Sequence, residues 1–145
     1  MKWAREVLPR LMDEYILAGK VRLDYRYIVF QPESLWAAAA SECAKDQGQF
    51  WPYHHLLAQE QTPLKHPTLD KELLKRMAEK VDVDTAAFNA CVDSDKYESM
   101  VVAESEAAEQ QGIVSTPTFF IDGEMIRGAQ PYEVFKEAID RALSR

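Results

Sequence analysis

The sequence lacks a membrane-spanning segment, a signal peptide and an excess of basic residues. No apolar stretch approaches the about 20 residues that a spanning helix needs, and the first residues, MKWAREVLPRL, contain no uninterrupted apolar core. The formal net charge is -7, which argues against nucleic-acid binding because that function needs a basic face. Internal repeats and low-complexity segments are also absent. We therefore expect no membrane span within these residues and no nucleic-acid partner.

Residues that carry redox or metal chemistry are equally sparse. The two cysteines, Cys43 and Cys91, are far apart in the sequence, and no C-x-x-C motif occurs, so no thiol pair with a lowered pKa at a helix N-terminus is expected. His54 and His55 are adjacent on a predicted helix and point about 100° apart, which disfavours a joint metal site. His66 lies in a predicted loop. We therefore predict no metal, no cofactor and no catalytic residue within these residues.

The remaining composition is that of an ordinary globular domain. The 145 residues are 47% hydrophobic and 28% charged, enough to bury one sizeable core. We predict a single domain over residues 1–145.

The spacing of apolar residues predicts a mostly helical chain. A first helix over 2–17 should kink at Pro9, because proline lacks the amide for a helical bond. Further helices are expected at 35–46 with Ser34 as N-cap, 50–59, 71–80 after Thr68 or Asp70, a short stretch after Asp84, 96–111 after Asp95, and 131–144. Thr62 to Thr68 reads as a surface loop. Glu104 and Glu109 are expected on a solvated helix face.

Strand signals are fewer. Val21, Leu23, Tyr25 and Tyr27 alternate with charged residues, which predicts a half-buried strand over 21–29. Asp122-Gly123 between TFFI and EMIR predicts a two-residue hairpin.

The segment VSTPTFFIDG, residues 114–123, is the most informative in the chain. A predicted helix ends at Gly112, Thr116-Pro117 is the best candidate for a cis peptide, the hairpin follows, and GAQPY leads into the last helix. This order resembles the C-terminal half of the thioredoxin fold, specifically that of the DsbA-type thiol-disulfide oxidoreductases. Residues 37–57 look like the helical insertion of that family. The resemblance runs from about Glu6 to Leu143 and implies an α/β thioredoxin-like fold with a helical insertion over about 34–111.

The departure from the family concerns its catalytic motif. Family members place a strand ending in C-x-x-C directly before the helix that here holds Glu6 to Tyr15. The resemblance thus implies a fold missing the strand that precedes the catalytic motif. Unpaired strand edges cost on the order of 1 to 3 kcal/mol per buried group. We expect the slot to be closed by sliding the two neighbouring strands together, filled by a segment from another copy, or filled by an N-terminal piece; exchange between copies would give a homodimer.

The resemblance also bears on the two cysteines. Some DsbA-like proteins carry a second, structural disulfide between these two helices, which implies that Cys43 and Cys91 are paired. Two buried free thiols are the alternative, since buried free cysteine is common.

Thr116 and Pro117 are the candidate substrate-binding residues. In the family, the cis-proline loop faces the reactive disulfide and offers its backbone to a bound protein or peptide substrate. Alternatively, the cis-proline turn has a structural role alone and only sets the direction of the next strand.

Two functions stay open on these grounds. In the first, the chain is the bulk of a DsbA-like protein-disulfide oxidoreductase and is inactive by itself because it has no C-x-x-C. In the second, it is a redox-inactive module that binds peptides or a partner. Family members usually act outside the cytoplasm, although the compartment of this chain is not given by its own residues.

Overall fold

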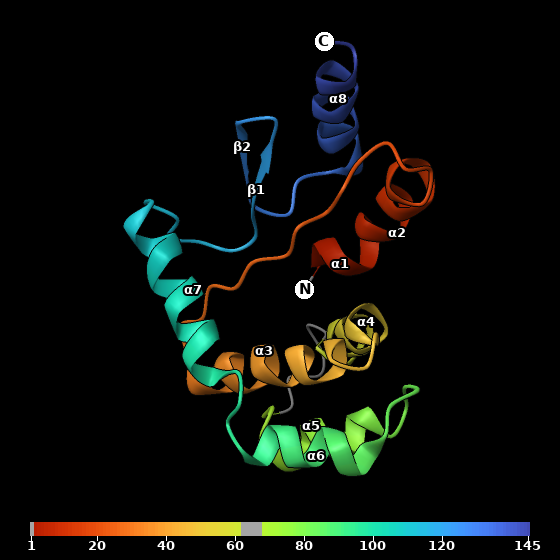
Figure 1. Cartoon of the computed structure of the whole chain (residues 1–145). Helices are drawn as coiled ribbons and strands as arrows, with labels where there is room; N and C mark the ends of the chain where they lie inside the picture. Colours follow the sequence, from red (N-terminus) through yellow and green to blue (C-terminus); the bar gives the residue numbers. More distant parts are fainter. Residues whose placement is uncertain (1, 62–67) are drawn as a thin grey trace. The chain divides into compact units, whose positions relative to one another are not determined.

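The computed structural model describes residues 2–61 and 68–145 (Figure 1). The predicted loop from Thr62 to Thr68 therefore lies almost wholly outside the described residues, as does His66. The chain divides into two compact units, one made of Met1–Tyr25 with Ile113–Arg145 and the other of Arg26–Gly112. We call them the hairpin unit and the helical unit. That residues 1–145 form a single domain stays a prediction.

The hairpin unit begins with an interrupted helix. Helix α1 spans Lys2–Glu6, α2 spans Leu8–Leu11, and a π-helical turn follows at Met12–Ile16. Pro9 occupies the first turn of α2, where its missing amide costs least, but it cannot bond back to α1. A kink was predicted at Pro9; the structure interrupts the helix at Val7, two residues earlier.

A short hairpin and a closing helix complete this unit. Strand β1, Thr118–Ile121, pairs antiparallel with β2, Glu124–Arg127, and Phe119 lies opposite Ile126. Asp122 and Gly123 both have positive φ, 49° and 84°, as a two-residue type I′ turn requires. Helix α8 spans Tyr132–Leu143. The predicted hairpin and the last helix are confirmed.

The core of the hairpin unit contains a cluster of three aromatic rings. The ring of Phe119 lies 4.7 Å from that of Trp3 and 4.8 Å from that of Phe135. Polar contacts join the π-helical turn to α8: the Tyr15 hydroxyl donates to Asp140 at 2.7 Å, and the Tyr132 hydroxyl donates to Glu14. Burial and the bond to Glu14 raise the pKa of Tyr132 to about 12.

Among its described residues, the helical unit contains five helices, whose bounds agree with the predicted ones to within a few residues. They are α3 at Pro32–Lys45, α4 at Phe50–Glu60, α5 at Lys71–Ala78, α6 at Thr85–Asp93 and α7 at Glu98–Gln110. Asp70 caps α5 by accepting from the Leu73 amide, and Asp84 caps α6 by accepting from that of Ala87. Side chains of α3 to α6 form its main core, with Tyr53, Leu74 and Phe88 fully buried.

Three expectations are corrected. Residues 21–29 form no strand: in the described part of the chain the sheet contains only β1 and β2. Ser34 does not cap α3, because Pro32 already occupies its first turn and Gln31 precedes it. Asp95 does not cap α7, whose N-cap is Tyr97; Asp95 instead takes a positive φ of 55° in the preceding turn. A homodimer through strand exchange stays a prediction.

Candidate functional site

The loop between α7 and β1 carries the predicted substrate-binding residues. The Thr116–Pro117 peptide bond is cis. The Thr118 hydroxyl donates to the Ser115 carbonyl at 2.7 Å, and the Gly128 amide donates to the Pro117 carbonyl at 2.8 Å. The loop is therefore tied on one side by the continuation of the β1–β2 ladder.

Phe119 anchors the loop to the core of the hairpin unit. Its ring is held between Trp3 of α1 and Phe135 of α8, and both of these side chains are buried. Because Phe119 follows Pro117 by two residues, this packing fixes where β1 begins.

The main chain of Thr116 stays open. Thr116 is exposed, and within residues 2–61 and 68–145 neither its amide nor its carbonyl takes part in a hydrogen bond. Pro117 has no amide to donate. Open main-chain groups beside a fixed strand are what an extended polypeptide can pair with.

Cys43 of α3 and Cys91 of α6 form a disulfide in the helical unit, with their Cα atoms 5.9 Å apart. Neither cysteine is a free thiol, and Cys43 is only 2% exposed. The bond joins two of the helices whose side chains form the main core of this unit.

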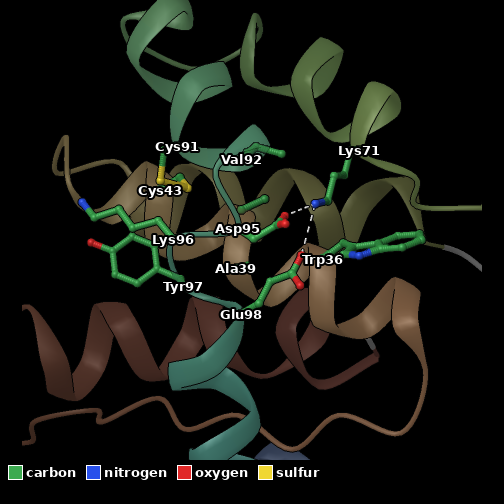
Figure 2. A pocket seen from close by; sticks show the side chains of 11 residues that line it. Trp36, Ala39, Cys43, Lys71, Cys91, Val92, Asp95, Lys96, Tyr97 and Glu98 are labelled. Carbon is green, nitrogen blue, oxygen red and sulfur yellow. Dashed lines mark hydrogen bonds and ion pairs between the residues drawn. A yellow bond between two sulfur atoms is a disulfide. The ribbon is translucent and has the colours of Figure 1, made fainter.

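The disulfide borders a small pocket of the helical unit (Figure 2). At the opposite side, Lys71 extends between Asp95 and Glu98, pairing with the first and lying 3.2 Å from the second. The hydrogen bond to Asp95 is the main cause of the raised pKa of Lys71. The same bond lowers the pKa of Asp95. Lys71 thereby links α5 to the turn before α7. Its positive charge is paired with these two carboxylates.

His54 and His55 lie in different environments. His54 is buried at 4% exposure and stacks on Phe50, whereas His55 is exposed and contacts Gln59. Burial, and to a smaller extent His55, lowers the pKa of His54 to about 4. No cluster of three or more metal-ligating side chains occurs among the described residues. None of the helices described is long and apolar enough to cross a membrane.

Two residues of α7 have roles that the sequence analysis missed. Glu104 does not lie on a solvated face: its carboxylate accepts from Arg26 at 2.9 Å and from the Tyr27 amide at 3.2 Å. Ser105, only 3% exposed, accepts from the Val29 amide at 3.0 Å. The spacing of four residues from the apolar Val101 places Ser105 on the buried face of the helix, and that signal was available in the sequence.

Comparison with known protein families is decisive for the fold. A family model described as thioredoxin matches residues 1–141. The chain belongs to the thioredoxin family. "Probable disulfide bond formation protein D" of Bacillus anthracis is 30% identical over 151 residues, which cover 99% of this chain and 67% of the relative. A "putative protein-disulfide oxidoreductase" of Rickettsia felis is 25% identical over 138 residues, 94% of this chain and 49% of the relative. This thioredoxin-family chain thus spans 49% to 67% of the length of these two relatives.

Solved structures agree with this family. Oxidised BdbD from Bacillus subtilis superposes with a TM-score of 0.87 at 22% identity, covering 99% of this chain and 80% of that one. Wolbachia pipientis alpha-DsbA1 gives a TM-score of 0.81 at 24% identity, covering 98% of this chain and 78% of that one. The predicted DsbA-type thioredoxin fold with its helical insertion is confirmed.

Proposed function

We propose that this chain is the substrate-binding body of a DsbA-like protein-disulfide oxidoreductase. Relatives with names of that activity match over nearly the whole chain. The observation that carries the proposal is the open main chain of Thr116, next to a strand held in place by Phe119.

The substrate of this site is an extended segment of protein. Its main chain pairs with the amide and carbonyl of Thr116, while Pro117 shapes the loop and donates nothing itself. Pairing through main-chain groups accepts many sequences, which suits an enzyme that acts on different proteins.

Thiol-disulfide exchange requires a thiolate that attacks a disulfide sulfur. Both cysteines of these 145 residues are bonded to each other, and they are too far apart in sequence for a C-x-x-C pair. We assign Cys43 and Cys91 a structural role, and assign no exchange activity to these residues alone. A structural disulfide fits an oxidising, extracytoplasmic compartment. Exchange passes electrons between sulfur atoms, so no cofactor is involved.

Titration with a reduced, unfolded peptide tests the binding site. We expect the ¹H–¹⁵N signal of Thr116 to shift with peptide concentration, and those of exposed α7 residues such as Glu106 to stay constant. Thr116→Pro removes the donor and should weaken binding about 2- to 10-fold, the value of one hydrogen bond.

Val114→Pro is the matched control, because Val114 lies in the same loop, is 74% exposed and would receive the same new ring. Equal loss of affinity in both variants, or no peptide-dependent shift at Thr116, would overturn the assignment of this site. A separate insulin-reduction assay on the 145 residues should be blank; robust turnover would show that the structural role of the cysteines is wrong.

A further inference from the structure

Helix α7 supplies hydrogen bonds to the segment Arg26–Val29 in the way that a neighbouring strand would. The Tyr27 amide donates to the Glu104 carboxylate at 3.2 Å, and the Val29 amide donates to the Ser105 hydroxyl at 3.0 Å. The same hydroxyl lies 3.5 Å from the Val29 carbonyl and donates to it. Two consecutive side chains of one helix thus bond to alternate amides of this segment.

Both helix residues are held firmly in place. Ser105 lies one turn after Val101, which is fully buried, and is itself 3% exposed. The Glu104 side chain is 25% exposed and is fixed by Arg26 through an ion pair of 2.9 Å. On the segment itself, the hydroxyl of Tyr27 donates to the buried Glu42 of α3 at 2.8 Å. The contacts therefore constrain the segment from two helices.

The pattern determines which way the remaining amides point. In extended backbone, amides two residues apart lie on the same side and the intervening ones lie on the other. With Tyr27 and Val29 directed at α7, the amides of Ile28 and Phe30 point away from it. Neither amide donates a hydrogen bond within the part of the chain that the structure describes.

We infer that Glu104 and Ser105 are positioning residues that occupy one edge of the segment Arg26–Val29 and leave it a single open edge. A polypeptide strand that joins this segment must then pair with Ile28 and Phe30, since the amides of Tyr27 and Val29 are already bonded. The inference goes beyond the proposed function and holds whether or not the chain exchanges disulfides.

Residue-resolved amide hydrogen exchange on the 145-residue chain tests this assignment. In the wild-type protein the amides of Tyr27 and Val29 should exchange at least ~10-fold more slowly than those of Ile28 and Phe30. Glu104→Ala should accelerate exchange mainly at Tyr27, and Ser105→Ala mainly at Val29. A general loss of stability would instead accelerate all four amides together.

Two further variants sharpen the result. Glu104→Gln keeps an acceptor oxygen and should restore slow exchange at Tyr27. Glu106→Ala changes an exposed glutamate of the same helix and should leave all four amides unchanged. Equal exchange rates for alternate amides in the wild type, or faster exchange at Tyr27 in Glu104→Gln as large as in Glu104→Ala, would overturn the inference. Circular dichroism on each variant confirms that the helices are retained before exchange is compared.

Discussion

The hydroxyl of Tyr27 donates a 2.8 Å hydrogen bond to the carboxylate of Glu42, and the two residues are each 7% exposed. The second contact of Glu42 is with Lys45, 3.0 Å away on the next turn of α3. A buried carboxylate that loses a donor is expensive to leave unpaired.

Tyr27→Phe should therefore lower the free energy of unfolding by about 1.5 to 3 kcal/mol, the range for a hydrogen bond to a charged group. Urea titration followed by circular dichroism measures it. A double-mutant cycle with Glu42→Gln separates this bond from other contacts of the ring. If the two single changes add without coupling, the bond contributes nothing.

Reduction of the disulfide between Cys43 and Cys91 should destabilise the helical unit. The bond closes a loop across a sequence separation of 48, and loop-closure entropy for that length is worth about 4 kcal/mol. Urea midpoints with and without dithiothreitol give the effect. Cys43→Ala/Cys91→Ala should match the reduced wild type and be insensitive to dithiothreitol. An unchanged midpoint, with two free thiols titrated after reduction, would contradict the expected role.

His54 should make stability depend on pH between about 6.5 and 4. Burial lowers its pKa from 6.5 to about 4 in the folded protein, so the unfolded chain takes up a proton first as the pH falls. Stability is fully present above the unfolded pKa and decreases as the pH falls toward 4, by up to about 3 kcal/mol.

Comparing His54→Phe with wild type isolates this dependence from that of the carboxylates. The variant should lose less stability between pH 7 and 4, measured by urea titration at each pH. His55→Gln, at the exposed neighbouring position, should keep nearly the wild-type slope. Equal slopes in His54→Phe and wild type would show that His54 does not carry the effect.

Local patterns predicted most of the helical framework. Asp70 was one of two candidate caps, beside Thr68, and Asp84 was predicted to begin a helix. Both accept amides, and such a start is predictable because a side-chain cap depends on only three or four neighbouring residues. The interruption near Pro9 and the hairpin at Asp122-Gly123 are local in the same sense.

Interactions between distant residues explain the failed predictions for residues 21–29 and for Glu104. The alternation over 21–29 predicted a strand, but a strand requires a neighbouring one, and the amides of Tyr27 and Val29 bond to α7 instead. Glu104 was assigned to solvent because its partner, Arg26, lies 78 residues earlier. Periodicity of one segment contains no information about such a partner. The open main chain of Thr116 was suggested only by resemblance to a family.

Substitution of Gly123 tests the conformation of the hairpin turn. This hairpin positions β1 and hence the Thr116 loop. The φ of Gly123 is 84°, and a Cβ at this position would meet no atom within 4 Å, so Gly123→Ala introduces backbone strain without a steric clash. We expect a loss of about 1 to 2 kcal/mol, measured by urea titration. Gly123→Asn should lose less, because asparagine tolerates positive φ better than alanine. The order Gly, Asn, Ala in decreasing stability supports the type I′ turn, whereas equal stability of the glycine and alanine proteins would mean that the turn adopts another conformation in solution.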